Sequence, residues 1–539
     1  MKKSIILILT FFCAISLADA QEFQMVKDIH LTGNSSPLFF TAYNGKFYFE
    51  ANSENDGKEL WVSDGSESGT QLVKDINSLG NSNLGGLTVY ENKLYFVATD
   101  GVNGHELWTS DGTEAGTQMV KDINPSGDSS PNYFTVYNGK LYFEANDDLH
   151  GRELWVSDGT EAGTQMLKDI NGNPGEGAGA GFLTVFDGKL YFSAYGDVAN
   201  GRELWVTDGT EAGTQMLKDI RPGYGSSVAK YFTPYNGKLY FAADNGSDGD
   251  ELWVTDGTET GTQMVKNINT IEGSNPNGFI IMNDKLYFSA STSDHGIELW
   301  VTDGSESGTQ MVKDIYPLHG NGSPRDYVVF NNQLYFTAYD NSNGSELWVS
   351  DGTEAGTMML KNIHPTADSF PGFFTVYDEK LYFTADDGSN GIEFWVTDGT
   401  EAGTQKIAPE IAPGSEPTNS GPMRRAYQLF EYQNSLYFNA NFTNDGLELW
   451  KFTSENMNVQ DFISTSIHLY PNPVKNEFYI SSDQMIDQVL IYDVAGKLIF
   501  QKEFNQKEVK INSTPFEKGV YVVKIRSHKA WKTLKLIKN

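Results

Sequence analysis

Hydrophobic and polar positions alternate along most of the chain in short runs that turn residues separate. One such group, rich in aromatic and β-branched side chains, comprises residues 134–137, 141–145, 153–157 and 164–170. Alternation with a period of two is typical of half-buried β-strands. Asn138-Gly139 joins the first two runs, and both residues tolerate the positive φ of a two-residue hairpin. The pattern predicts four antiparallel strands in a unit of about 48 residues.

This unit recurs nine times, and a Glu-Leu/Phe-Trp sequence marks its third strand. The tryptophans are Trp61, Trp108, Trp155, Trp205, Trp253, Trp300, Trp348, Trp395 and Trp450, at spacings of 47, 47, 50, 48, 47, 48, 47 and 55 residues. A fixed period of this length is typical of repeat architectures, whose units bury their apolar faces against one another. We therefore predict an all-β protein with a β-propeller of about nine four-stranded blades.

The loop between the third and fourth strands predicts a register for each unit. If residues 64–69 form a six-residue loop, Trp61 faces Leu72 and Glu59 faces Lys74. Opposite charges at facing positions contribute about 0.2–1 kcal/mol per pair. The repeated glutamate is therefore interpreted as a structural partner of the lysine rather than as a catalyst.

The last two units depart from the pattern. In the eighth, Lys406-Ile407-Ala408-Pro409 replaces the usual sequence and leaves Glu393 facing an alanine instead of a lysine. The ninth has no fourth strand, but Met25–Ile29 is a spare copy of that strand near the N-terminus. We expect this segment to pair with the ninth unit, with Lys27 opposite Glu448, because closure of the ring hides the exposed sheet edges.

The spacing of apolar runs changes after residue 466. Five runs predict the strands of a small β-sandwich, at residues 478–480, 489–493, 497–500, 519–525 and 531–537. The predicted organisation is a signal peptide at residues 1–20, the propeller at 21–456, and a linker with a C-terminal domain at 457–539.

Charge divides the chain in the same way. Residues 21–456 contain 25 Lys and Arg against 62 Asp and Glu, a net charge of −37, whereas residues 457–539 contain 12 against 8, a net charge of +4. An acidic surface of this size repels polyanions, which argues against nucleic acid and anionic membranes as partners.

The first twenty residues have the pattern of a secretory signal. Lys2 and Lys3 precede an apolar run that ends at Leu17, and Ala18-Asp19-Ala20 supplies small residues for cleavage. The run is too short to favour a membrane span, so we expect no direct membrane insertion. The only cysteine, Cys13, lies in this segment, and the mature chain is therefore predicted to fold without disulfides.

Two resemblances add to this interpretation. The repeat that reads Glu153-Leu154-Trp155-Val156-Ser157-Asp158-Gly159-Thr160 resembles the ELWxxDGT repeat of bacterial secreted proteins, from residue 21 to about 452. That repeat implies no particular activity.

The C-terminal domain resembles the type A sorting domain of the type IX secretion system of Bacteroidota. The resemblance rests on the landmarks Pro471, Asn472, Pro473, Asp493, Gly496, Gly519 and Tyr521, and on a basic final strand. It implies the type IX secretion machinery as a partner and export through the periplasm and outer membrane to the cell surface or medium.

Sequence motifs of catalysis are missing. The chain has no zinc-type cysteine pair, no HExxH, no GxSxG and no phosphate-binding glycine loop, so we predict no catalytic residue and no cofactor. The repeated Asp-Gly-Thr is interpreted as an Asx-turn. Calcium would need several converging oxygen ligands; the weak candidates are the loop residues Asp100, Asp147, Asp148, Asp386 and Asp387, whose other interpretation is a solvated loop.

One rim of the predicted propeller carries tight, nearly invariant turns, and the other carries the differences between units. Because variable loops on a rigid scaffold commonly bind ligands, we expect ligand on this variable rim near the axis, with Tyr224, His319, Arg424 and Arg425 as candidates. The hypothesis is a secreted or cell-surface binding or adhesion protein whose ligand is a glycan or a protein. The alternatives are a polysaccharide hydrolase or lyase that uses axial Asp and Glu, and a structural surface protein without a specific ligand.

Overall fold

The structure is a computed structural model. It describes residues 22–196, 199–389, 391–407, 429–443, 445–454, 468–470, 473–493, 497–516, 518–527 and 530–538. Their regular secondary structure is entirely β-strand. None of these residues forms a helix long and apolar enough to cross a membrane. One compact unit spans Phe23–Phe452, and a second contains Thr453–Asn539.

The larger unit contains nine four-stranded antiparallel sheets, as predicted. The first three are β2 (Leu38–Tyr43), β3 (Lys46–Ser53), β4 (Gly57–Ser63), β5 (Gln71–Lys74); β6 (Gly85–Tyr90), β7 (Lys93–Thr99), β8 (His105–Ser110), β9 (Gln118–Lys121); and β10 (Asn132–Tyr137), β11 (Lys140–Asn146), β12 (Arg152–Ser157), β13 (Gln165–Lys168). The next three are β14 (Gly181–Phe186), β15 (Lys189–Tyr195), β16 (Arg202–Thr207), β17 (Gln215–Lys218); β18 (Lys230–Tyr235), β19 (Lys238–Asp244), β20 (Asp250–Thr255), β21 (Gln263–Lys266); and β22 (Asn277–Met282), β23 (Lys285–Thr292), β24 (Gly296–Thr302), β25 (Gln310–Lys313). The last three are β26 (Arg325–Phe330), β27 (Gln333–Asp340), β28 (Gly344–Ser350), β29 (Met358–Lys361); β30 (Gly372–Tyr377), β31 (Lys380–Asp386), β32 (Ile392–Thr397), β33 (Gln405–Lys406); and β34 (Phe430–Tyr432), β35 (Ser435–Ala440), β36 (Glu448–Thr453) with β1 (Glu22–Lys27).

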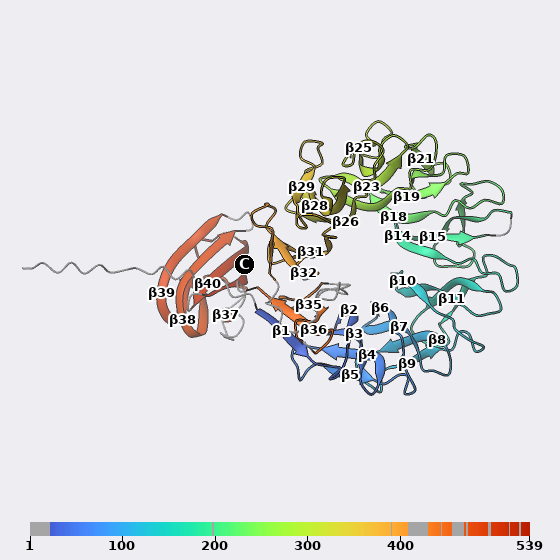
Figure 1. The fold of residues 1–539 in the computed structure, drawn as a ribbon. Helices are drawn as coiled ribbons and strands as arrows, with labels where there is room; N and C mark the ends of the chain where they lie inside the picture. Colours follow the sequence, from blue (N-terminus) through green and yellow to red (C-terminus); the bar gives the residue numbers. More distant parts are fainter. Residues whose placement is uncertain are drawn as a thin grey trace, which may run out of the picture. The chain divides into compact units, whose positions relative to one another are not determined.

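The sheets are arranged around an axis, with the first strand of each sheet on the inner side of the ring and the fourth on the outer side (Figure 1). Each core cluster lies between two neighbouring sheets. Tyr95 and Leu107 of the second sheet, for example, pack with Leu141, Phe143 and Trp155 of the third. Full burial of one such side chain contributes about 1.5–3 kcal/mol. A sheet therefore gains its stability from its neighbours, as in other repeat proteins.

The turns have the predicted chemistry. Asn138 and Gly139 have φ of 47° and 68°, as a two-residue hairpin of this type requires. Asp158 Oδ1 accepts hydrogen bonds from Thr160 N at 2.9 Å and from Thr160 Oγ1 at 2.7 Å. The repeated aspartate thus closes an Asx-turn on its own loop, and this prediction is confirmed.

The predicted register between the third and fourth strands is correct only in part. Trp155 faces Met166, but a bulge between Leu154 and Trp155 brings Lys168 opposite Leu154. The expected pairing of the repeated glutamate with the repeated lysine, Glu59 with Lys74 among them, is therefore wrong. Lys168 Nζ instead donates to the carbonyl oxygen of Thr214 in the next sheet, at 2.7 Å. The lysine is an inter-blade tether, because its partner belongs to the neighbouring blade.

The repeated glutamate is structural, but its partners are backbone amides. Glu153 is fully buried. Its Oε2 accepts from Ile170 N at 3.0 Å and its Oε1 from Ala178 N at 2.9 Å, so it holds the connection that leads to the next blade. Burial raises the pKa of Glu153 to about 7, and the amide hydrogen bonds oppose this shift. A raised pKa means that the native state binds the proton more tightly than the unfolded chain, so this contribution to stability is full below about pH 4.5 and is lost as the pH rises through about 7.

The N-terminal strand closes the ring. β1 pairs with β36 and completes the sheet of β34 and β35, as predicted. Glu448 of that sheet accepts from Ile29 N at 2.8 Å and Ser35 N at 2.9 Å, while Lys27 Nζ donates to Thr70 O at 2.7 Å. Lys27 thus binds a backbone oxygen of the first blade, as Lys168 binds one of the fourth, and Glu448 binds backbone amides instead of the expected lysine. The resulting seam joins residues more than 400 positions apart in sequence.

The eighth blade differs from the others at its short outer strand. Lys406 faces Trp395, and its Nζ lies 2.7 Å from Glu393 Oε2 and 2.8 Å from Asp387 Oδ2. Glu393 therefore has a lysine partner, Lys406, while the expectation that it faces Ala408 stays a prediction. Ala408 itself is outside the described residues.

The C-terminal unit is a small β-domain of β37 (His468–Tyr470), β38 (Glu477–Asp493), β39 (Leu498–Asn512), β40 (Gly519–Ser527) and β41 (Ala530–Lys538). Residues 478–480 and 489–493, predicted as separate strands, belong to the single 17-residue strand β38. β38 pairs with β37 near its start and with β40 near its end.

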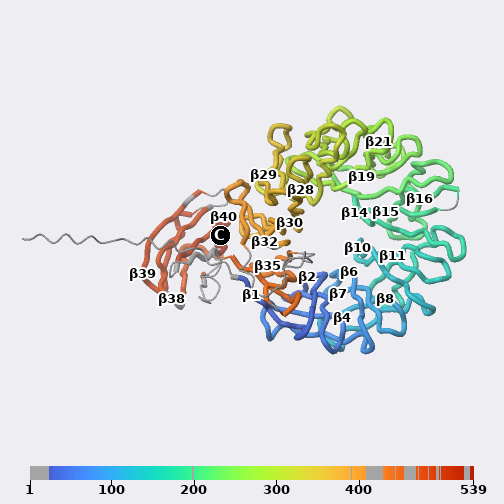
Figure 2. The backbone as a smooth tube through the Cα atoms, viewed as in Figure 1, coloured from blue at the N-terminus to red at the C-terminus, as the bar shows by residue number. Residues whose placement is uncertain are grey.

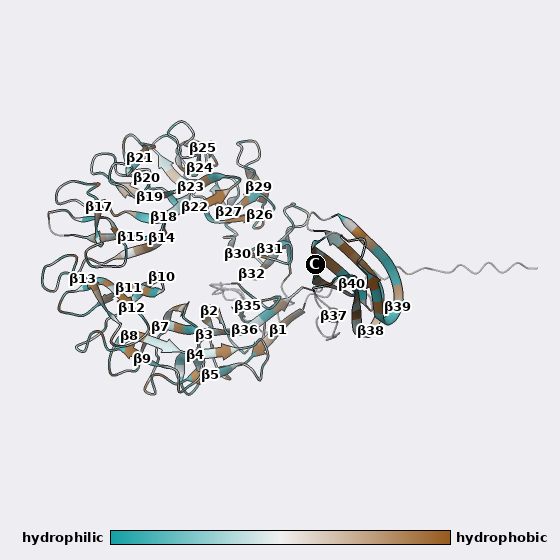
Figure 3. Cartoon of the chain, turned by 180° about the vertical axis from the view of Figure 1, so that it is seen from behind, coloured by the Kyte–Doolittle hydropathy of each residue, from teal (hydrophilic) through white to brown (hydrophobic). Residues whose placement is uncertain are grey.

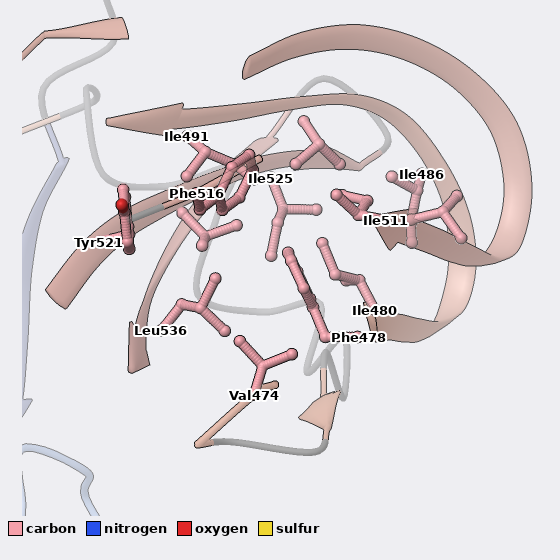
Figure 4. Close-up of a cluster of buried hydrophobic side chains, with 13 residues drawn as sticks. Val474, Phe478, Ile480, Ile486, Ile491, Ile511, Phe516, Tyr521, Ile525 and Leu536 are labelled. Atoms are coloured by element: carbon pink, nitrogen blue, oxygen red, sulfur yellow. The ribbon is translucent and has the colours of Figure 1, made fainter. Parts of the chain in front are cut away.

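Both halves of β38 contribute to one apolar core. Phe478 and Ile480 from the first half and Ile491 from the second meet Ile525 and Leu536 there (Figure 4). β40 is largely apolar and β38 carries apolar runs near both ends, whereas the middle of β39 is polar (Figure 3). Of the sorting landmarks, Gly519 and Tyr521 lie on β40, Asp493 faces Tyr521, and Pro473 precedes β38. Pro471, Asn472 and Gly496 lie outside the described residues.

Removal of Met25–Ile29 should lower the melting temperature and promote self-association, because it exposes the edge of β36. Thermal unfolding and light scattering of the truncated and parent proteins measure both effects. An unchanged melting temperature in a monomeric protein would contradict the closure.

Replacement of Glu153 by Gln should cost about 1–3 kcal/mol of unfolding free energy, because an amide nitrogen cannot accept the hydrogen bond of Ile170 or Ala178. The cost should be larger at pH 5 than at pH 8, since only the parent side chain gains stability from protonation. Denaturant unfolding measures this, with the exposed Glu161→Gln as control. Equal stability of the two variants would contradict the assigned role.

Candidate functional site

Of the four ligand-binding residues predicted on the variable rim, the structure describes Tyr224 and His319. Tyr224 is 85% exposed in the connection between β17 and β18. His319 lies in the connection between β25 and β26, where its Nδ1 is 3.2 Å from Ser293 O. The two residues belong to different blades, and neither lines the cavity described below. Arg424 and Arg425 lie outside the described residues. All four stay predictions.

The carboxylates considered for calcium mostly bind their own loops. Asp100 Oδ1 accepts from Val102 N at 2.9 Å, Asp147 Oδ2 is 2.7 Å from His150 Nδ1, and Asp387 Oδ2 is 2.8 Å from Lys406 Nζ. The remaining two, Asp148 and Asp386, meet Ser126 Oγ at 3.0 Å and Gly388 N at 2.7 Å. No group of three or more His, Cys, Asp or Glu side chains in the described part of the chain is placed to hold a metal ion. Calcium binding stays a prediction.

The innermost strands carry an unusual backbone feature at their start. In the first eight blades the second residue of this strand has positive φ, next to a register shift such as that between Asn132 and Thr135. These residues, with φ between 56° and 68°, are Phe39, Gly86, Tyr133, Phe182, Tyr231, Gly278, Asp326 and Phe373. Positive φ is typical of glycine and costs a residue with a side chain about 1–3 kcal/mol. Two blades use glycine there, whereas five place an aromatic residue at this cost.

Three of these aromatic residues lie in consecutive blades and contact one another. Tyr133 on β10, Phe182 on β14 and Tyr231 on β18 have neighbouring ring centroids 6.0 Å apart in both pairs. Tyr133 is 40% exposed and Tyr231 is 45% exposed. The three strands follow one another on the inner side of the ring (Figure 2). We call these three residues the aromatic arc.

A cavity of about 460 Å³ opens beside the aromatic arc. Its wall is formed by the second, third and fourth sheets. It includes the rings of Tyr133 and Phe182, the polar side chains of His105, Asn132, Glu144, Arg152 and Arg202, and the glycines Gly85, Gly86, Gly179 and Gly181. A Cβ at Gly179 would lie 2.5 Å from Arg202 Nη2, so glycine at this position leaves room for the guanidinium. An aromatic wall with a few convergent polar groups is the usual composition of a small-ligand site.

Three charged side chains cluster in this cavity. Glu144 is nearly buried, and its Oε2 lies 3.4 Å from Arg152 Nη1. Arg202 Nη1 donates to Ser193 O at 3.1 Å, and its guanidinium lies over the ring of Tyr195 at 5.1 Å. Burial raises the pKa of Glu144, and the positive charges of Arg152 and Arg202 oppose this rise. Burial also lowers the pKa of Arg202, and the negative charge of Glu144 opposes this shift.

The sequence contained a signal for this site that analysis of single residues missed. Comparison of the repeats at one position, the second residue of the inner strand, shows glycine in two blades and an aromatic residue in five. The cost of the aromatic residue becomes visible only with the backbone conformation. The residue before the repeated glutamate also differs between blades. It is Lys58 in the first blade, Arg152 in the third and Arg202 in the fourth.

Two family models match the chain. Residues 468–539 match the secretion system C-terminal sorting domain. Residues 45–350, which form more than half of the chain, match the model described as outer membrane protein assembly factor BamB.

Two characterised proteins match short parts of the chain. Ulvan lyase NLR42 of Nonlabens ulvanivorans is 29% identical over 99 residues, which are 18% of this chain and 18% of the lyase. An endo-acting ulvan lyase of Formosa agariphila is 33% identical over 87 residues, 15% of this chain and 17% of the lyase. The chain thus spans less than a fifth of the length of these relatives.

Similar solved structures include PorZ, a surface component of the type IX secretion system of Porphyromonas gingivalis, with a TM-score of 0.35 and 14% identity over 94% of this chain and 75% of PorZ. A puromycin hydrolase gives 0.35 and 12% over 67% of this chain and 60% of the hydrolase. The extracellular domain of the putative one component system BT4673 from B. thetaiotaomicron gives 0.29 and 10% over 94% and 87%.

Replacement of Tyr133 by glycine should be less destabilising than replacement of Val136 by glycine, by at least about 1 kcal/mol, because glycine relieves the positive φ at residue 133 only. The two residues share β10 and have similar exposures of 40% and 44%, so they form a matched pair. Denaturant unfolding measures the difference. An equal or larger loss for Tyr133→Gly would show that the conformation carries no cost.

Proposed function

We propose that this chain, which belongs to the family described as outer membrane protein assembly factor BamB, carries a carbohydrate-binding propeller that acts outside the cell. The sorting domain at residues 468–539 directs export by the type IX secretion system to the cell surface or the medium, and it implies interaction with that machinery. The finer identification, a protein of the ELWxxDGT-repeat type, rests on the repeated sequence.

The proposed organisation is a signal peptide at residues 1–20, the binding propeller at 21–456, and a linker and sorting domain at 457–539. The change of net charge between the two parts supports this division. Residues 21–456 have a net charge of −37, from 25 cations and 62 anions, and residues 457–539 have a net charge of +4, from 12 cations and 8 anions.

The aromatic arc is the observation that carries the proposal. Tyr133 and Tyr231, which are 40% and 45% exposed in a costly backbone conformation, add little to folding, and glycine occupies the same position in two other blades. The C–H faces of sugar rings carry partial positive charge and stack on the negative faces of aromatic rings. The amide, carboxylate and guanidinium groups beside the arc offer donors and acceptors for sugar hydroxyls. Rows of such rings suit a chain of sugars better than an isolated small molecule.

Other ligand classes fit less well. Nucleic acid also stacks on aromatic rings, but the propeller's excess of 62 anions over 25 cations opposes its approach. A folded protein partner needs a broad contact surface, about 800 Å² on each partner. The arc instead lies on the innermost strands beside a polar cavity.

Catalysis is the alternative, and the ion pairs argue against it. A glycosidase needs one carboxyl group to donate a proton and a second to attack or to activate water. Two second strands carry a glutamate opposite the leucine of the third strand. They are Glu50 in the first blade and Glu144 in the third. Each lies beside its own cation, Lys58 at 3.5 Å and Arg152 at 3.4 Å. Such pairs favour binding over proton transfer.

A glycan array followed by calorimetry of the purified propeller with the best oligosaccharide tests the proposal. The variant Tyr133→Gly/Phe182→Gly/Tyr231→Gly should lose at least about tenfold in affinity, since each stacked ring contributes about 0.5–1.5 kcal/mol. The matched control is Phe39→Gly/Phe373→Gly, two residues with the same conformation and exposures of 46% and 45% that lie outside the arc.

The control should bind as the parent does. Equal losses in both variants, or full affinity in the first, would contradict the site. Release of unsaturated or reducing ends from the bound glycan by the parent protein would identify an enzyme instead.

A further inference from the structure

We propose that the cavity beside the aromatic arc selects a sugar that carries an anionic group, a carboxylate or a sulfate ester, which Arg202 and Arg152 bind while the sugar ring stacks on Tyr133 or Phe182. This inference rests on the proposed carbohydrate-binding function and names the class of glycan.

The first support is an imbalance of charge in the cavity. Arg152 and Arg202 face a single carboxylate, Glu144, which lies within 4.0 Å of Arg152 only. The acceptors of Arg202 are the carbonyl oxygens of Ser193 at 3.1 Å and Ala178 at 3.5 Å. Carbonyl oxygens accept hydrogen bonds but do not neutralise a cation. A guanidinium has five N–H donors, so both forks retain donors for a ligand.

The second support comes from comparison of the blades. Other cations around the axis each have a carboxylate of their own blade nearby. The pairs are Lys58–Glu50 at 3.5 Å, Lys230–Asp250 at 2.7 Å and Arg325–Asp326 at 3.6 Å. In the fourth blade Ser193 occupies the strand position that Glu144 occupies in the third. Among the described residues, no carboxylate oxygen lies within 4.0 Å of a guanidinium nitrogen of Arg202.

The third support is the contrast with the rest of the propeller. Its net charge of −37, from 25 cations and 62 anions, repels an anionic chain from most of its surface. Screening limits this repulsion to about 8 Å at physiological ionic strength, so the groups in contact decide binding. A cavity with one uncompensated positive charge is then a place where an anionic sugar is attracted.

The geometry also fits the chemistry of the anion. Carboxylate and sulfate offer two or more oxygens to the planar fork of an arginine, which gives short, directional hydrogen bonds. The aromatic rings of Tyr133 and Phe182 line the same cavity, so one sugar unit can stack and present its anionic group together. A neutral sugar would leave the charge of Arg202 without a counter-ion.

Calorimetry of the full chain with three oligosaccharides of equal length tests this selection: a galacturonate, a sulfated dextran and a neutral glucan. The parent should bind one of the two anionic chains at least about tenfold more tightly than the neutral one. The comparison between galacturonate and sulfated dextran distinguishes the two sources of charge. The affinity should fall as salt is added, by a larger factor for the anionic chains.

Arg202→Met should remove this preference: it should weaken binding of the anionic chain by a factor at least about tenfold larger than the factor for the neutral chain, because only the anionic chain loses its counter-ion. Arg202→Lys retains the charge and should keep part of the preference. Thermal unfolding of each variant shows whether any loss of binding in Arg202→Met comes from misfolding. Lys58→Met is the control, since Lys58 has the same position in the first blade but has Glu50 as its partner.

A parent that binds the neutral chain as tightly as the anionic ones, or an Arg202→Met variant with unchanged preference, would overturn the inference while the carbohydrate-binding function stands. Failure of all three chains to bind, or binding that the aromatic-arc variant retains, would instead refute the proposed function. Tighter binding of an oligothymidylate than of any oligosaccharide would overturn both.

Discussion

A buried glutamate that accepts hydrogen bonds from the following connection is the interaction on which each blade and the candidate site depend. Glu106, Glu153 and Glu203 accept from Ser129, Ala178 and Ser227 at 3.0, 2.9 and 3.0 Å. Each of these amides lies four residues before a member of the aromatic arc. The glutamate therefore fixes the path by which the chain enters the innermost strand. A buried carboxylate without such donors would carry a large desolvation cost. Any movement of the connection that breaks these bonds is therefore unfavourable.

Uniform support allows variation at the axis. The sheets, turns and lysine tethers repeat almost without change, and a site arises where the repeats differ. Tyr133, Phe182 and Tyr231 lie where two other blades have glycine, and Ser193 lies where the third blade has Glu144. These differences cost stability at the position where they occur. Burial between neighbouring blades supplies many times that amount, so the scaffold tolerates the cost.

The periodicity of the sequence predicted most of the fold. The Trp spacing, the Asn-Gly hairpins and the spare strand at Met25–Ile29 predicted nine closed blades because each is a local feature of the sequence. The Glu–Lys pairing was wrong because a one-residue bulge leaves no mark in the alternation of polar and apolar positions. The site was placed on loop residues such as Tyr224 because variability suggested it. The aromatic arc could not be found in that way, since its members resemble ordinary strand residues until φ is known.

The central claim is that ligand lies on the inner wall at the aromatic arc. A crystal structure of the propeller soaked with the oligosaccharide that it binds most tightly tests this most directly. The account predicts density for a sugar ring parallel to the ring of Tyr133 or Phe182, with an anionic oxygen within hydrogen-bond distance of Arg202. Sugar density at the tips of the connections near Tyr224 or His319, with the arc unoccupied, would contradict it.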